Sequence, residues 1–161
     1  LLTQIKRFKK LLIFSGLFNI VLAFPLIIPG FFKSYINFIY YLNEAMRLGG
    51  VKPVLPEDGL SQLLINTAGI DLVLIGSIVL VSSIDPIKFR LIPLLNAIGR
   101  TLFAAIIVYY ILVYDVVRFV LIIGIIDILI SMGFVYFLVQ TRKKTLYNKA
   151  NSADAKRRAA D

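Results

Sequence analysis

The chain has no cysteine and no histidine among its 161 residues. The lack of cysteine excludes disulfide bonds and thiolate chemistry. The lack of histidine removes the usual general base and the imidazole ligands of haem, copper and zinc. The sequence also contains no nucleophile–base pair, no cluster of metal-ligating side chains and no glycine-rich phosphate loop. We therefore expect a protein that is not an enzyme and that carries no cofactor.

Apolar residues dominate what is present. Hydrophobic amino acids make up 59% of the chain, against roughly 45–50% in globular proteins. They form four runs of about 20 residues or more, the length that crosses a hydrocarbon core of ~30 Å as a helix. The sequence therefore predicts an all-α, polytopic membrane protein, an antiparallel bundle of four transmembrane helices over residues 1–140. The predicted spans are residues 11–31, 60–83, 91–113 and 117–139.

The one long loop, residues 32–60, contains a further amphipathic segment. Ser34 is expected to cap a short interfacial helix that ends at Gly49 and Gly50. Two interpretations of this segment stay open: a helix that lies on the membrane surface, anchored by tyrosines, or a loop that simply covers the mouth of the bundle. The apolar positions on one face of this helix are Phe38, Ile39, Leu42, Ala45 and Met46.

Basic residues are distributed unequally between the two sides of the predicted bundle. Thirteen Lys and Arg lie before the first span, between the second and third, or after the fourth, and four lie in the loops of the other side. Because positively charged segments stay in the cytoplasm, both termini are expected there. The basic tail, residues 141–161, is expected to be a helical extension or a disordered segment. This charge distribution favours contact with anionic lipid headgroups at the cytoplasmic face, not with nucleic acid.

Each predicted span carries one strongly polar residue near mid-depth, three positions after a small residue. Residues three apart share a helical face, so the small residue lets a neighbouring helix approach beside the polar group. A charge at this depth is costly unless it meets a partner. The four pairs are Gly16–Asn19, Ala68–Asp71, Ala97–Arg100 and Gly124–Asp127. The expected buried polar layer comprises Asn19, Asp71, Asn96, Arg100, Asp127 and Ser131.

Three interpretations of this layer stay open. In the first, Arg100 forms salt bridges with Asp71, Asp127 or both, and the network fixes helix pairing. In the second, two carboxylates and one guanidinium leave one net negative charge, which suits a proton relay or a cation. In the third, Arg100 recognises an anionic or polar lipid headgroup.

The layout also resembles bacterial four-helix inner-membrane proteins of the DoxX or BphX type. The resemblance covers the four spans and not the tail. It implies the four-helix fold and a location in the bacterial inner membrane, and it implies no activity. It rests on the short basic segment before the first span, the pair Gly16 and Asn19, the link residues Ser83, Asp85 and Pro86, and Arg100 early in the third span.

Three functions are consistent with these features. We first expect a non-enzymatic accessory or scaffold subunit, or a self-associating bundle, present as a homo-oligomer or within a larger membrane complex. The first alternative is a small proton- or cation-coupled transporter or channel that uses Asp71 and Asp127. The second alternative is a lipid- or quinone-binding module, in which the polar layer meets the headgroup and the apolar spans surround the tail.

Overall fold

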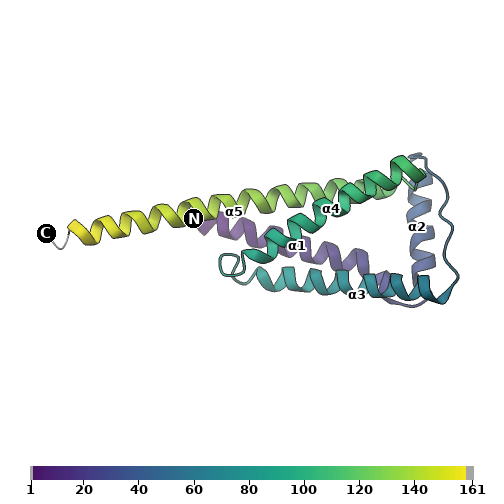
Figure 1. The fold of residues 1–161 in the computed structure, drawn as a ribbon, viewed down its shortest axis with the longest axis horizontal. Helices are drawn as coiled ribbons and strands as arrows, with labels where there is room; N and C mark the ends of the chain where they lie inside the picture. Colours follow the sequence, from purple (N-terminus) through teal and green to yellow (C-terminus); the bar gives the residue numbers. More distant parts are fainter. Residues whose placement is uncertain (1, 159–161) are drawn as a thin grey trace.

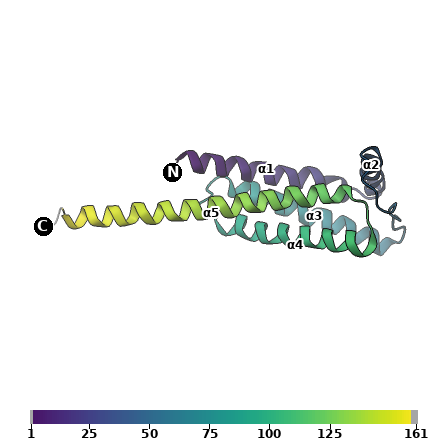
Figure 2. The same cartoon turned by 90° about the horizontal axis from the view of Figure 1, so that it is seen from above.

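A computed structural model describes the backbone of residues 2–158 and the side chains as far as residue 142. Within this part of the chain it contains five helices: α1 (Leu2–Ile27), α2 (Phe31–Ala45), α3 (Gly59–Ser82), α4 (Leu91–Tyr114) and α5 (Phe119–Arg158). All except α2 are long and apolar enough to cross a membrane. These four form an elongated antiparallel bundle, and α2 lies across one end of it (Figures 1 and 2). The predicted all-α, multi-pass membrane fold is confirmed.

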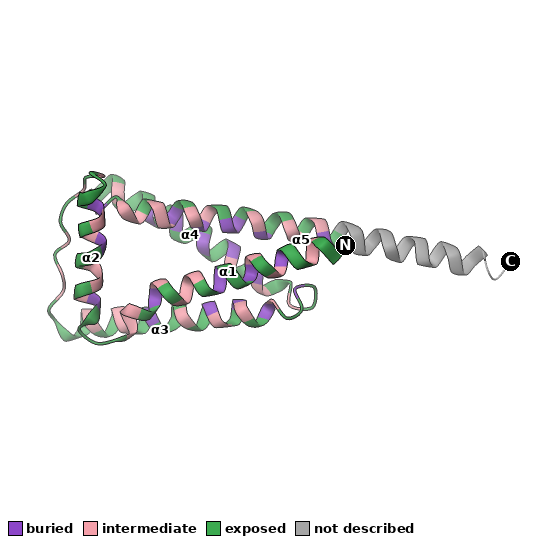
Figure 3. Cartoon of the chain, turned by 180° about the vertical axis from the view of Figure 1, so that it is seen from behind, coloured by how far each residue is buried: buried purple, intermediate pink, exposed green. Residues whose placement is uncertain are grey.

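The outer surface of the bundle is apolar. Large hydrophobic side chains are exposed on all four spanning helices, for example Val21, Leu64, Leu112 and Leu129, and exposed positions run along the whole length of the bundle (Figure 3). An exposed apolar surface of this size is unfavourable in water. It is stable in the hydrocarbon of a bilayer, where each helix also satisfies its own backbone hydrogen bonds. The molecule is therefore folded for a lipid environment.

The helix ends agree with the sequence prediction more closely for some spans than for others. α3, α4 and the start of α5 lie within two residues of the predicted bounds. α1 instead begins at Leu2 and ends at Ile27, two residues after Pro25, because a proline removes a backbone donor and disfavours further helix. α5 continues to Arg158, so the tail is a helical extension as far as that residue. Its expected lipid contacts lie outside the described side chains.

The spanning helices form two pairs, α1 with α3 and α4 with α5. The first pair is close because glycines meet: a Cβ added to Gly16 would lie 2.7 Å from the carbonyl oxygen of Gly76. A Cβ on Gly76 would in turn lie 2.8 Å from the carbonyl oxygen of Gly16. Small residues allow such backbone approach between membrane helices. The prediction that Gly16 admits a neighbouring helix is confirmed.

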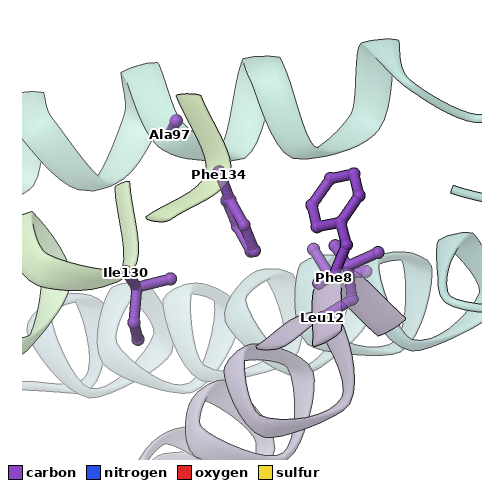
Figure 4. Close-up of a cluster of buried hydrophobic side chains, with 6 residues drawn as sticks. Phe8, Leu12, Ala97, Ile130 and Phe134 are labelled. Atoms are coloured by element: carbon purple, nitrogen blue, oxygen red, sulfur yellow. The ribbon is translucent and has the colours of Figure 1, made fainter. Parts of the chain in front are cut away.

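The two pairs meet in an apolar core near the end of the bundle that carries the N-terminus. The Phe8 ring packs edge-on against Phe134 and stacks on Phe137 with centroids 5.4 Å apart. Figure 4 shows Phe8 and Phe134 directed toward each other. Toward α2 the pairs diverge (Figure 1). The buried core residues are Phe8, Leu12, Val79, Ala97, Ile130 and Phe134.

α2 differs from the helix that the sequence predicts. It begins at Phe31, after Gly30 with a φ of 80°, so Ser34 lies within the helix and is not its cap. Ile39 on the predicted apolar face is buried, whereas Phe38 is 55% exposed. The reason is that α2 packs on α1 and α5 across the end of the bundle, so tertiary contacts select its buried face. The predicted short helix in this loop is confirmed, and it lies across the mouth of the bundle.

Asn43 joins α2 to the connections at this end of the bundle. Its side chain is fully buried; Nδ2 donates to the Gly49 carbonyl at 2.9 Å, and Oδ1 accepts from the Phe119 N–H at 3.0 Å. Gly50 has a φ of 97°, and a Cβ there would lie 2.6 Å from the Val116 carbonyl oxygen. Only glycine fits this crossing of two loops.

Candidate functional site

Arg100 of α4 is the centre of a buried polar cluster that joins three helices. It is 5% exposed, and its Nη1 donates to Asp127 Oδ1 on α5 in a salt bridge. Nε donates to Asn96 Oδ1 at 2.8 Å, one turn earlier on α4. Nη2 donates to α1, to the carbonyl and hydroxyl oxygens of Ser15 at 3.1 and 3.0 Å and to Asn19 Oδ1. The predicted contact between Arg100 and Asp127 is confirmed.

Ser131 supports this cluster from α5. Its hydroxyl hydrogen is shared between the Asp127 carbonyl at 2.9 Å and the Ala97 carbonyl at 3.1 Å. The second bond crosses from α5 to α4 at a small residue, where the two backbones are close. Ser131 therefore holds the helices that carry Arg100 and Asp127 against each other.

Asp71 does not belong to the buried layer. Its side chain and that of Ala68 are exposed on α3. Among the described residues the salt bridge of Arg100 is made with Asp127. The prediction that Asp71 lies in the layer is therefore wrong, and Asp71 and Asp127 do not form the single two-carboxylate site on which the transport alternative depends.

The orientation of α3 explains this difference. α3 turns Gly69 and Gly76 toward α1, where a Cβ on Gly69 would lie 2.8 Å from the Leu26 side chain. Asp71 follows Gly69 by two residues, which is about 200° around a helix of 3.6 residues per turn. Gly69, not Ala68, is the small residue that meets a neighbouring helix. The carboxylate of Asp71 consequently points away from α1.

Ser15 is the member of the cluster that the sequence analysis missed. It is fully buried and precedes Asn19 by one turn on the same face of α1. A polar residue four positions before another in an apolar span places both on one face. That spacing was the signal that would have identified it.

A cavity of about 600 Å³ extends from this cluster to α2, between the two helix pairs. Its volume lies within the ~300–1,000 Å³ of small-molecule sites. All five helices contribute to its lining, which is apolar apart from Tyr35 of α2 and the polar cluster. The cluster residues on its wall are Asn19, Asn96, Arg100 and Asp127.

The cavity opens between α3 and α4. Its lining residues on α1, α2 and α5 are buried or half-buried, whereas exposed lining residues occur on α3 and α4. Both helices are membrane spans by length and composition, so this opening faces the hydrocarbon of the bilayer. The exposed lining residues are Leu72, Ile75, Ile78, Leu95, Gly99 and Phe103.

Asp71 lies at the edge of this opening. It precedes Ile75 and Ile78 by four and seven residues, and both of these line the cavity. Positions i, i+4 and i+7 share one helical face. The carboxylate is therefore on the cavity side of α3, nearer to α2, although it is not part of the lining.

No family model, curated protein or solved structure matches the chain. The resemblance to DoxX- or BphX-type proteins therefore stays a prediction. Fold and site together define a multi-pass membrane protein with a laterally open apolar cavity, whose polar end is a neutralised ion pair. In the part of the chain with described residues, no three acidic side chains converge as a metal site would require.

Proposed function

We propose that this protein binds a membrane amphiphile in the cavity between its helix pairs. The observation that carries the proposal is the apolar cavity itself, with one polar cluster on its wall and an opening between two spans. Ligand sites combine an apolar lining with a few polar groups that orient the ligand. A molecule with an apolar tail and a polar head matches both parts, and the bilayer supplies it directly to the opening. This is the lipid- or quinone-binding alternative, and it requires no catalysis.

We also propose that the protein lies in a bacterial inner membrane with both termini in the cytoplasm. Thirteen of its 18 Lys and Arg belong to the terminal segments and the α3–α4 connection. Positive charge is retained on the cytoplasmic side. In this orientation the basic segments meet anionic headgroups, and α2 lies at the outer surface.

The test of amphiphile binding uses the full chain extracted with its surrounding lipid by an amphipathic copolymer. Mass spectrometry of the extract is expected to show one amphiphile enriched over the bulk membrane. In Gly99→Leu the new side chain adds bulk to the lining at the opening of the cavity, where a Cβ meets no atom within 4 Å. We expect its retention of the amphiphile to fall about tenfold, which corresponds to ~1.4 kcal/mol.

Ile98→Phe is the matched control for this substitution. Ile98 neighbours Gly99 but is 51% exposed and does not line the cavity, so the added bulk enters lipid. The control is expected to retain the amphiphile. A wild-type extract with bulk lipid composition, or equal retention in the two variants, would overturn the proposal.

A second candidate, association as an accessory subunit or a homo-oligomer, is favoured by Asp71. A carboxylate at mid-depth is costly in lipid unless a partner meets it. Within the described part of this chain, the side chain of Asp71 has neither an ion pair nor a hydrogen bond. A helix from a second copy or another subunit would supply that partner. The particle mass in nanodiscs tests this: Asp71→Leu is expected to convert an oligomer to a monomer, and an unchanged mass counts against association.

A further inference from the structure

We infer that the ligand of this cavity has an uncharged headgroup with carbonyl oxygens, and that the side-chain amides of Asn19 and Asn96 bind those oxygens. The inference rests on the proposed amphiphile-binding function and names the chemical class of the ligand. It follows from the way in which the buried cluster uses its own donors and acceptors.

All three nitrogens of the Arg100 guanidinium already donate within the cluster. An arginine has five N–H donors and no acceptor. Here Nε is directed to Asn96, Nη1 to Asp127, and Nη2 to Ser15 and Asn19. Its charge is balanced by Asp127, which is 4% exposed. An anionic headgroup would bring a second negative charge to a guanidinium that Asp127 already balances, and displacing Asp127 would leave a buried carboxylate without its partner, which is strongly unfavourable.

The two amides have only one orientation that suits the arginine. Because arginine has donors alone, Asn19 and Asn96 must each turn Oδ1 toward it. Each Nδ2 group is then directed away from the guanidinium. Both residues are half-buried and line the cavity, and in the described part of the chain neither Nδ2 group donates a hydrogen bond.

The free groups at the polar end therefore include two neutral amide donors. They come from two helices, Asn19 from α1 and Asn96 from α4, on either side of the guanidinium. A donor in apolar surroundings is unfavourable until an acceptor meets it. Acyl chains have no acceptor, whereas ester and ketone carbonyl oxygens do. This chemistry is shared by the ester headgroup of a diacylglycerol and the ring of a long-chain quinone.

The experiment measures the binding of four probes to the full chain in nanodiscs. The probes are a diacylglycerol, a long-chain quinone, an ether-linked dialkylglycerol without carbonyls, and phosphatidylglycerol as the anionic lipid. At least one of the two uncharged carbonyl probes, the diacylglycerol or the quinone, is expected to bind about tenfold more tightly than both the ether and phosphatidylglycerol, which combines ester carbonyls with an anionic phosphate; the difference is ~1.4 kcal/mol. Whichever carbonyl probe binds identifies the source of the headgroup.

Asn96→Asp tests the assigned residue. The substitution keeps an oxygen for Arg100 and replaces the amide donor with a second oxygen, so carbonyl binding is expected to fall about tenfold. Asn37→Asp is the matched control, since it adds the same charge at an exposed position of α2 outside the cavity. The thermal midpoint of each variant reports whether the fold is intact.

The outcomes separate this inference from the function on which it rests. Phosphatidylglycerol or the ether binding as tightly as the carbonyl probes would overturn the inference while leaving amphiphile binding in place. Equal losses in Asn96→Asp and Asn37→Asp would overturn the assignment of Asn96. No binding of any probe, together with a wild-type extract of bulk lipid composition, would overturn the proposed function as well.

Discussion

The region around Asp127 on α5 and the region around Asp71 on α3 have similar sequences. Each aspartate lies near the middle of an apolar span, three residues after a small residue. Asp127 is 4% exposed and contacts Arg100, whereas Asp71 is exposed beside the opening of the cavity. Identical local patterns therefore lead to opposite environments.

The difference comes from the small residue that makes the helix contact in each region. On α5 that residue is Gly124, since a Cβ there would lie 3.4 Å from the Ile107 side chain of α4, and Asp127 shares its face. On α3 it is Gly69, which directs Asp71 away from α1. The position of a polar group in a membrane bundle thus follows the backbone contact and not the nearest small residue.

The largest effect is expected from Arg100→Leu. The substitution leaves the buried Asp127 carboxylate unpaired, so we expect the free energy of unfolding to fall by ~3–5 kcal/mol. Unfolding by sodium dodecyl sulfate in mixed micelles measures it. Arg118→Leu is the control, because Arg118 lies in an exposed ion pair with Asp115 and should change stability by less than ~1 kcal/mol. Equal losses in the two variants would show that Arg100 does not hold the bundle together.

Removing both charges should restore part of this loss. In the double variant Arg100→Leu and Asp127→Leu no buried charge remains, so we expect it to be more stable than Arg100→Leu alone by ~2 kcal/mol. The acceptors of Asn19, Asn96 and Ser15 lose their donor, which keeps the recovery incomplete. Additive losses from the two single variants would contradict a direct interaction.

The glycine face of α3 is expected to be less tolerant than the cavity face of α4. In Gly76→Ala the new methyl group would lie 2.8 Å from a backbone oxygen of α1, and such overpacking costs ~1–3 kcal/mol. In Gly99→Ala the methyl group enters open space, and better helix propensity favours the variant by up to ~1 kcal/mol. Unfolding curves of the two variants, measured in parallel, give the two changes in the free energy of unfolding. A neutral Gly76→Ala would mean that α1 and α3 are not in close contact.

The smallest effect separates the two aspartates directly. When the protein is a monomer in micelles, Asp71→Asn should change the free energy of unfolding by less than ~0.5 kcal/mol, as at other exposed positions. Asp127→Asn keeps an acceptor oxygen for Arg100 but leaves the buried guanidinium without its counter-charge, so we expect the free energy of unfolding to fall by ~1.5–3 kcal/mol. Similar losses from both substitutions would show that Asp71 is buried in the monomer after all.

Much of the candidate site was predictable from the sequence. Arg100 and Asp127 carry opposite charges at a similar depth, and the cost of an unpaired charge in hydrocarbon leaves few other arrangements. The position of Asn19 was predicted from its spacing to Gly16, which shares its helical face and does allow α3 to approach. The four-residue spacing from Ser15 to Asn19 was a signal for Ser15, whereas Asn43 was missed because an asparagine outside the apolar spans is compatible with either a buried or an exposed position.

The sequence by itself determined the four spans, since a run of apolar residues in lipid must satisfy its backbone hydrogen bonds within its own helix. It also determined, through complementary charge, that Arg100 pairs with Asp71, Asp127 or both, and the tertiary structure selected Asp127. Only the tertiary structure decided which face of α3 is buried, because Ile, Leu and Val surround that helix and no polar side marks its orientation. The cavity likewise depends on the tertiary structure. It exists because two tightly packed helix pairs diverge toward α2, and local sequence does not encode the angle between pairs.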